Sequence, residues 1–481
     1  MDENQYLPYL KDDLGANYYK DHTDFVLWAP VSEEVILNIE TKKGNFKQIP
    51  LKKGEDNSFR ISVKGNLLNK KYYYTVKNNG ELVNTNDPWG KGTSFNSEYS
   101  AVVDIKAVDK LKNVPLKTKM NSYLDSIIYE LHIRDFTEDK HSDIEDKRHY
   151  LGVVEKGRTT WGGHPAGLDY LKFLGITHVQ ILPVLDFLGA DDANYMRGYN
   201  WGYNPISFFA LEGSFSKAPE IPQSRLLEFK KMVNELHRND IRVIIDVVYN
   251  HVYEYKNTSW QKLVPNYFFR FLPNGKISES SGCGNDFASE KPMGRKMIVD
   301  SLKYLVKTFD VDGFRFDLMG IIDVDTINEA FDECKKIKED VMFYGEGWNM
   351  PTALAENKRA SANNANQMPN IGFFNDTFRE VIKGATFDLH HKGFAAGATD
   401  NLPAVKYVMK GSTVDNPYPK RFEKPHQSIN YIECHDNGTI FDKYVVCNHN
   451  EPESLILERI KFANVMTMFS IGVPFFHMGQ E

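Results

Sequence analysis

The sequence has few cysteines and no long apolar stretch. Its 481 residues include 4 cysteines, and none of them forms a CxxC pair or a Cys/His spacing typical of a metal site. We therefore expect neither a disulfide framework nor a zinc site. No segment approaches the roughly 18 consecutive apolar residues that a membrane-spanning helix needs, so we expect no membrane partner.

An excess of positive charge is also lacking. The chain has 58 Lys+Arg against 65 Asp+Glu, a net charge of −7, which offers no basic footprint for phosphate groups. We therefore expect no nucleic-acid partner. The first residues, MDENQ, are acidic and polar, whereas a secretory signal begins basic and continues apolar. On this ground we expect a cytoplasmic protein.

Phosphate-binding glycine motifs are missing as well. No GxGxxG follows the first expected barrel strand, and no GxxxxGK occurs, so dinucleotide-binding and P-loop interpretations lack support. What the sequence does have is a balanced composition, 41% hydrophobic and 26% charged, with aromatic residues at 13%. This composition is typical of a globular protein of two or more domains. The aromatic residues fit a large core, and they also fit stacking surfaces for ring-shaped ligands.

We interpret residues 1–14 as an N-terminal extension, and two regions with different residue patterns follow it. Residues 15–105 show short alternating segments separated by Gly, Asn and Lys turns, which predicts a small β-sandwich. Residues 106–125 are rich in lysine and contain a proline, and we interpret them as a linker. Residues 126–481 alternate β-branched apolar runs with amphipathic windows, the pattern of βα units.

Eight strands are expected in this second region, which favours a (β/α)8 barrel of the TIM type over an open sheet. The expected strands are 127–133, 177–183, 241–248, 313–318, 342–345, 371–374, 429–434 and 474–477. The expected helices between them are 167–174, 225–238, 295–308, 325–336 and 455–470. The sequence stops after the eighth strand, so we expect the barrel to lack its last helix and the chain to be part of a longer polypeptide.

Charged residues follow four of the expected strands. Because catalytic groups of such barrels lie at the C-terminal ends of the strands, these residues are expected to converge on one rim. The four segments are VIIDVVYNH (243–251), GFRFD (313–317), FYGEGW (343–348) and NYIECHDN (430–437). A buried structural ion pair would explain any one of them, and Arg315 with Asp317 in particular. Four such segments in barrel register favour a catalytic site.

Three of these residues, Asp317, Glu346 and Asp436, are the carboxylates that glycoside hydrolysis requires. One carboxyl group attacks the sugar or stabilises an oxocarbenium-like centre, and another protonates the leaving oxygen. Arg315 lies two positions from Asp317, on the same face of a strand, and should keep that carboxylate ionised. Glu346, near Trp348 and other carboxylates, should hold its proton longer. His251 and His435 suit hydrogen bonds to sugar hydroxyls.

In their order and spacing the four segments resemble the conserved regions of the α-amylase family, glycoside hydrolase family 13. The resemblance implies that Asp317 is the nucleophile, Glu346 the acid/base and Asp436 the third acid at the cleavage subsite. It implies supporting roles for a further set: Asp246, Asn250, His251, Arg315, His435 and Asn437. We expect all of these except Asn250, together with Trp348, to bind substrate. It covers nearly the whole chain.

A narrower resemblance is carried by YNWGYNP at residues 199–205, which is similar to the YNWGYDP motif of type I pullulanases, with Asn204 in place of Asp. The resemblance implies that Tyr199 is an aromatic platform under a sugar ring. A loop rich in tyrosine and tryptophan packing over one end of the barrel is the alternative. Leu27-Trp28-Ala29-Pro30 in the sandwich is similar to carbohydrate-binding module family 48, and we interpret Trp28 as a core residue.

The resemblance implies a retaining hydrolase that cleaves α-1,6 branch linkages in pullulan, branched dextrins or glycogen, with the two catalytic carboxyl groups about 5–5.5 Å apart. Three alternatives stay open: an isoamylase-like debranching enzyme, a branching enzyme, and a glucan-binding protein without activity. We expect no required cofactor. Oxygen ligands near Asn250 would suit Ca²⁺, but no calcium-binding loop is recognisable, so the sequence assigns no metal ligand. It does not indicate an oligomeric state.

Overall fold

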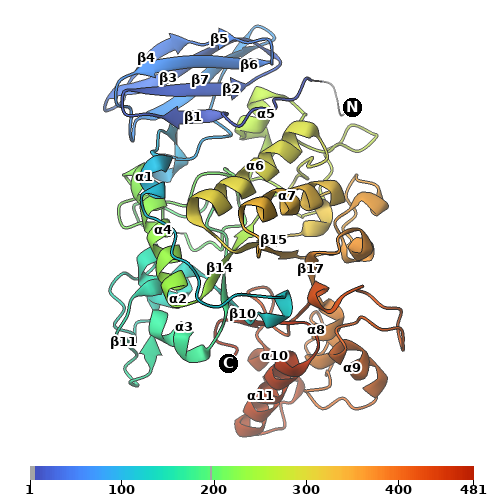
Figure 1. Ribbon diagram of the computed structural model, residues 1–481. Coiled ribbons are helices and arrows are strands. Elements are labelled where there is room, and N and C mark those ends of the chain that lie inside the picture. The colour runs from blue at the N-terminus through green and yellow to red at the C-terminus, as the bar shows by residue number, and fades with distance from the viewer. Residues whose placement is uncertain (1–5, 195–197) are drawn as a thin grey trace.

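A computed structural model describes residues 6–194 and 198–481. The acidic residues at the extreme N-terminus, on which the expected location depends, lie outside the described part. The chain folds into an N-terminal β-sandwich above a barrel (Figure 1). Within the described residues no helix has the length and apolar character needed to cross a bilayer.

The sandwich consists of two antiparallel sheets. One has the strand order β1-β2-β6-β5, and the other β4-β3-β7-β8, with β9 paired to β7. The strands are β1 (Gly15–Tyr18), β2 (His22–Trp28), β3 (Ser32–Lys42), β4 (Asn45–Pro50), β5 (Lys52–Lys53), β6 (Ser58–Lys64), β7 (Lys71–Asn78), β8 (Glu81–Thr85) and β9 (Ser100–Ala101). In β7, Tyr72, Tyr74 and Val76 are buried while the residues between them are more exposed, as the alternation predicts.

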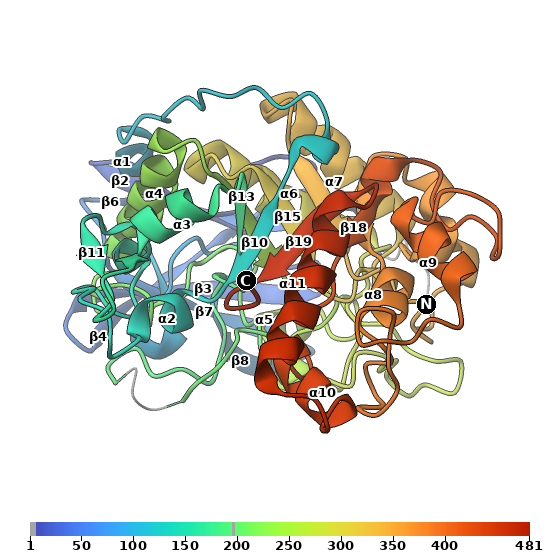
Figure 2. The same cartoon turned by 90° about the horizontal axis from the view of Figure 1, so that it is seen from below.

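Eight parallel strands close the barrel, in the order in which they occur along the chain. This confirms the predicted fold class. The strands are β10 (Ile128–Leu131), β13 (His178–Ile181), β14 (Arg242–Val247), β15 (Gly313–Phe316), β16 (Met342–Gly345), β17 (Ile371–Phe374), β18 (Ser428–Asn430) and β19 (Val473–His477). Figure 2 shows β10 beside β19, where the barrel closes.

The expected helices are all present, with bounds shifted by one to three residues. They are α3 (Leu168–Leu174), α4 (Pro222–Arg238), α6 (Pro292–Phe309), α7 (Val324–Ile337) and α11 (Glu453–Phe469). α4 and α6 each begin with proline in the first turn, where the missing N–H costs no hydrogen bond.

Several shorter helices were not expected, because a helix of two turns carries little periodicity. They are α1 (Ile105–Asp109), α2 (Ile133–Glu138), α5 (Ser259–Leu263), α8 (Asp376–Ile382), α9 (Leu402–Met409) and α10 (Ile440–Cys447). α1 falls largely within the expected linker. β18 is also shorter than predicted, because the chain leaves the barrel after Asn430 and the apolar residues Tyr431 and Ile432 are buried beyond the strand.

Sandwich and barrel share one continuous core. Trp28 is buried, its ring centroid lies 5.5 Å from that of Tyr267 in the barrel domain, and its indole N–H donates to the Leu7 carbonyl oxygen over 3.2 Å. Trp28 is therefore a core residue, as predicted, and presents no free face to a sugar.

Candidate active site

A cavity of about 640 Å³ opens at the C-terminal ends of the barrel strands. Because the residues after parallel strands meet at one edge, this rim collects side chains that are far apart in the sequence. It brings together eight of the ten predicted site residues: Asp317, Glu346, Asp436, His251, Arg315, Trp348, His435 and Asn437. Asp246 and Tyr199 are not part of its lining.

Arg315, buried near the end of β15, contacts three carboxylates at the base of the cavity. One guanidinium nitrogen, Nη1, lies 3.2 Å from Asp317 Oδ1 and 3.2 Å from Asp246 Oδ2, and the other, Nη2, lies 3.0 Å from Glu346 Oε1. A planar guanidinium can bind several carboxylates in fixed directions. Arg315 therefore fixes the position of Asp317 relative to Glu346.

Asp317 is held from a second side by Asn250. The Asn250 amide donates to Asp317 Oδ2 over 2.7 Å and to the Asp317 carbonyl oxygen over 2.9 Å. The Asn250 Oδ1 atom in turn lies 2.6 Å from His251 Nδ1, and His251 Nε2 lies 3.0 Å from the Tyr203 carbonyl oxygen. These contacts restrict the Asp317 carboxylate to one orientation, because Oδ1 contacts Arg315 and Oδ2 accepts from Asn250.

The Glu346 carboxyl group tends to keep its proton. Its Oε2 atom accepts a hydrogen bond from the Leu318 backbone N–H over 2.9 Å. Burial raises the pKa of the Glu346 carboxyl above its ordinary value, the Asp317 carboxylate adds to the effect, and Arg315 opposes it. This is the direction predicted from the sequence, although burial has the largest effect. A carboxyl group that keeps its proton beside a fixed carboxylate can act as a general acid.

Asp246 lies beneath the cavity, fully buried at the end of β14. Tyr203 donates its hydroxyl proton to Asp246 Oδ2 over 2.7 Å, and burial raises the pKa of Asp246 to about 7 against the attraction of Arg315. The prediction that Asp246 binds substrate directly is therefore not met by the geometry. Asp246 supports Arg315 and Tyr203, which do line the cavity.

His435 follows β18 and contacts Glu130 of β10. Its Nδ1 atom lies 2.9 Å from Glu130 Oε1, and its backbone N–H donates to Glu130 Oε2 over 2.8 Å. Burial opposes a charge on His435, but Glu130 raises the pKa of the imidazole to about 9. The same pair lowers the pKa of Glu130 to about 2 despite its burial. His435 is therefore a cation at neutral pH.

Glu130 and Tyr203 are the residues that the sequence analysis missed. Tyr203 stacks on His435, with ring centroids 5.1 Å apart and planes at 15°, and it lines the cavity. Tyr203 is the second tyrosine of the YNWGYNP motif, and Glu130 lies within the expected strand 127–133. The structure ends this strand at Leu131, so that Glu130 lies next to its C-terminal end, where catalytic groups of such barrels gather.

Tyr199 lies beside the cavity and not in its lining. Its ring packs edge-on against His132 and under Arg134, and its hydroxyl donates to Asp135 Oδ2 over 2.5 Å. About half of its surface is exposed. The two tyrosines of this short loop therefore point to different neighbours, and of the two only Tyr203 lines the cavity with the carboxylates. The role of Tyr199 as a platform under a sugar ring stays a prediction.

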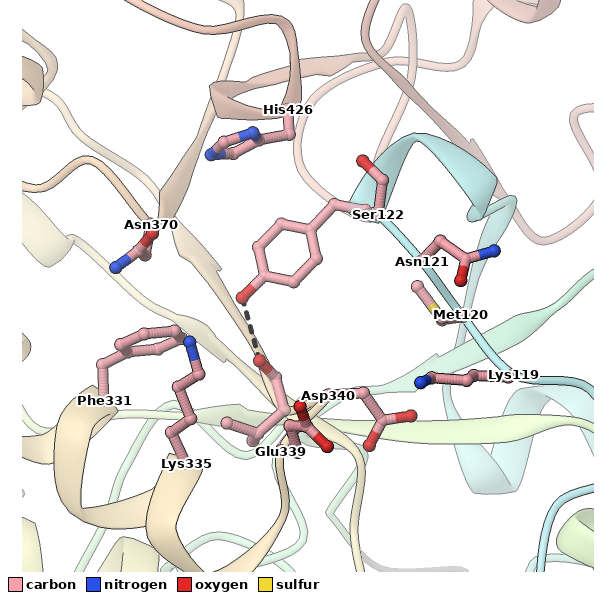
Figure 3. Close-up of a pocket in the computed structure, with 12 residues that line it drawn as sticks. Lys119, Met120, Asn121, Ser122, Phe331, Lys335, Glu339, Asp340, Asn370 and His426 are labelled. Carbon is pink, nitrogen blue, oxygen red and sulfur yellow. Dashed lines mark hydrogen bonds between the residues drawn. The ribbon is translucent and has the colours of Figure 1, made fainter.

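A second cavity, of about 590 Å³, lies at the opposite, N-terminal ends of the strands (Figure 3). Tyr123 is among its lining residues and donates its hydroxyl proton to the Val341 carbonyl oxygen over 2.9 Å. Lys119, Lys335, Glu339, Asp340 and His426 are also among its lining residues, and all five are labelled in the figure. This end of such a barrel usually serves stability.

No group of three or more His, Cys, Asp or Glu side chains arranged to hold a metal ion is found among residues 6–194 and 198–481. The oxygens near Asn250 are engaged instead, because the Asn250 side chain bonds to Asp317 and His251.

Comparison with known proteins shows the family of the chain. Residues 13–90 match carbohydrate-binding module 48, the isoamylase N-terminal domain, and residues 136–274 match the alpha amylase catalytic domain. A solved pullulanase from an Anoxybacillus species, in complex with maltotriose, is 40% identical and superposes with a TM-score of 0.95 over 99% of this chain and 68% of that chain. The chain belongs to the pullulanase family.

Three other pullulanases are also similar to this chain. The pullulanase of Bacillus subtilis is 40% identical over 98% of this chain, and pullulanase A of Streptococcus pneumoniae is 31% identical over 97%. The chain spans 66% of the length of the first and 39% of the second. A Paenibacillus barengoltzii pullulanase solved with maltohexaose and alpha-cyclodextrin is 36% identical, with a TM-score of 0.96, and the match covers 99% of this chain and 75% of that one.

Proposed function

We propose that the chain is a retaining glycoside hydrolase that cleaves α-1,6-glucosidic linkages in pullulan and branched α-glucans. The observation that carries the proposal is the contact of one buried guanidinium, Arg315, with both Asp317 and Glu346 on the rim of an open cavity. Membership of the pullulanase family supports the bond specificity.

In this mechanism Asp317, fixed by Arg315 and Asn250, attacks the anomeric carbon while Glu346 gives its proton to the leaving oxygen. A glycosyl ester to Asp317 results. Glu346, now a carboxylate, removes a proton from water, and the water replaces Asp317 at the same carbon. Two displacements at one carbon retain the α configuration of the released sugar.

Asp436 and Tyr203 act on the sugar itself. Asp436 is half exposed and lines the cavity, with its Oδ1 atom 3.8 Å from Nε2 of the cationic His435. It can bind sugar hydroxyls, and its negative charge stabilises the positive charge that develops on the sugar. Tyr203, rather than Tyr199, supplies the aromatic face at the cleavage point. No step of this mechanism requires a cofactor, and we assign no role to Ca²⁺.

Digesting pullulan and amylose in parallel tests the proposal. We expect maltotriose from pullulan, little change in amylose, and the α anomer as the first product seen by proton NMR. Release of the β anomer would contradict the retaining mechanism. Cleavage of amylose alone would indicate an α-1,4 specificity, transfer of chains without net hydrolysis a branching enzyme, and binding without any product a glucan-binding protein.

A further inference from the structure

A groove of about 390 Å³ separates the sandwich from the barrel, outside the active-site cavity. Its sandwich wall comes from β7, β8 and the segment 85–100, and its barrel wall from residues near 188, 206 and 253–262. Its volume lies in the ~300–1,000 Å³ range of small-molecule sites, which occur preferentially at domain interfaces. Nothing in the proposed mechanism uses this groove.

Aromatic rings occur on both walls. Tyr73 and Tyr99, both half-buried, lie on the sandwich side with ring centroids 5.7 Å apart, and Tyr253 lies exposed on the barrel side. Phe46 packs behind the first two, at 5.3 Å from Tyr73 and 5.2 Å from Tyr99, without lining the groove. This arrangement leaves apolar ring surface next to solvent and fixes its position.

Apart from Leu188 and Ile206, the remaining lining is polar and carries no surplus of positive charge. Asn84, Glu98, Glu254 and Lys262 supply amide, carboxylate and ammonium groups among serine and threonine hydroxyls. Flat apolar faces combined with hydrogen-bonding groups of both kinds suit a neutral, polyhydroxylated ring, and they do not suit a phosphate or a nucleic acid.

Hydrogen bonds between the domains fix the two walls relative to each other. Ser97 donates its hydroxyl proton to Asp186 Oδ2 over 2.7 Å, and Thr93 donates to the same oxygen over 2.6 Å. Elsewhere along the interface, Asn78 Nδ2 donates to the Lys262 carbonyl oxygen over 2.9 Å. A site that is already formed loses less entropy when a ligand binds.

The groove also shares segments with the active site. Tyr253 follows His251 by two residues, and its backbone N–H donates to the Pro205 carbonyl oxygen over 2.9 Å, next to the loop that carries Tyr203. We propose that this groove is an accessory binding site for a linear α-1,4-glucan segment, which tethers polymeric substrate beside the catalytic cavity. The ligand class rests on the proposed function.

Tethering predicts an effect that depends on substrate length, because a second contact raises the effective concentration of a polymer and not of a short sugar. The substitutions Tyr99→Ala and Tyr253→Ala remove one ring from each wall. We expect each to raise KM for pullulan about two- to tenfold, as loss of one stacking contact does, with kcat unchanged. Hydrolysis of a branched tetrasaccharide of two α-1,6-linked maltose units should not change.

Phe46→Ala is the matched control, since it removes a ring of the same cluster that does not line the groove. Melting temperature and far-UV circular dichroism confirm the fold of each variant. Retardation in native gels that contain amylopectin measures binding without hydrolysis. We expect weaker retardation of the two tyrosine variants and not of Phe46→Ala.

Unchanged KM for pullulan and unchanged retardation in both tyrosine variants would overturn the inference, as would an equal effect of Phe46→Ala, which would indicate a change in packing. If the wild type hydrolyses no substrate but its retardation depends on Tyr99 and Tyr253, the groove binds glucan and the proposed function fails instead. The two failures are therefore distinguishable.

Discussion

Asn250 donates hydrogen bonds to both the side chain and the backbone of Asp317, over 2.7 Å and 2.9 Å. Asn250 follows β14 and Asp317 follows β15, so two neighbouring strands of the barrel fix the orientation of the proposed nucleophile. The guanidinium of Arg315 supplies the remaining contact to this carboxylate.

Replacing Asn250 by alanine should therefore lower kcat with less effect on KM. Loss of a buried hydrogen bond to a charged group costs about 1.5–3 kcal/mol, which corresponds to about a 10- to 150-fold loss of rate. Steady-state kinetics on pullulan measure it. Asn274→Ala, in an exposed loop, is the control, and activity of Asn250→Ala equal to that control would remove Asn250 from the site.

Tyr203 and Tyr199 should respond differently to substitution. Tyr203→Ala removes the ring stacked on His435 and should lower kcat/KM strongly, while Tyr203→Phe loses only the hydrogen bond to Asp246 and should retain more activity. Tyr199→Ala should have the smaller effect of the two alanine variants. A larger loss of activity in Tyr199→Ala than in Tyr203→Ala would instead support Tyr199 as the aromatic platform under the sugar ring.

The protonation of Glu346 should depend on Asp317. Because its raised pKa reflects burial and the nearby Asp317 carboxylate, Asp317→Asn should lower the pKa of Glu346. Carbon-13 NMR of labelled glutamate in the inactive variant measures this. In the wild type, a general acid must be protonated, so kcat/KM should fall as pH rises through the raised pKa of Glu346. Glu346 titrating identically in both proteins would contradict the coupling.

Asp436 should be required for turnover and not for folding, because its side chain is about half exposed. Asp436→Asn keeps the shape of the side chain and removes the charge opposite the developing cation, so we expect a loss of at least about 100-fold in kcat. Thermal unfolding should be unchanged. Near-normal rates in this variant would exclude Asp436 from the catalytic site.

The buried carboxyl group of Glu212, at the interface of barrel and sandwich, should make the stability of the fold depend on pH. Burial raises its pKa to about 8, and Asp186 and Asp192 add to the shift. Because the folded state holds this proton more tightly than the unfolded chain does, stability should fall as pH rises from about 4.5 towards 8.

Glu212→Gln removes the titrating group while it keeps an oxygen for the Ser214 backbone N–H, which donates to Glu212 over 2.8 Å. We expect a higher melting temperature than the wild type at pH 8 to 9 and a smaller difference at pH 5. Calorimetry across this range measures it, and parallel curves for the two proteins would show that the pKa of Glu212 is the same in the folded and unfolded states.

Much of this protein was determined by local sequence. All residues of the eight barrel strands except His477 are buried, and most of these strands lie in apolar segments of the sequence. The helices α4, α6 and α7 each carry an apolar stripe, so the sequence indicates both kinds of element. The three acids and Arg315 could be found because they follow strands whose ends must meet. The short helices α8, α9 and α10 gave no such signal, since two turns contain too few residues to show a period.

Only the tertiary structure decided which side chains of the rim face the cavity. Tyr199 and Tyr203 are four residues apart in one loop, and their sequence surroundings are nearly equal, yet one packs under Arg134 and the other stacks on His435. The contacts that separate them come from distant parts of the chain, the start of α2 for Tyr199 and the segment after β18 for Tyr203, which no local pattern near the two tyrosines encodes. The groove between the sandwich and the barrel arises in the same way, because its two walls meet only when the domains pack.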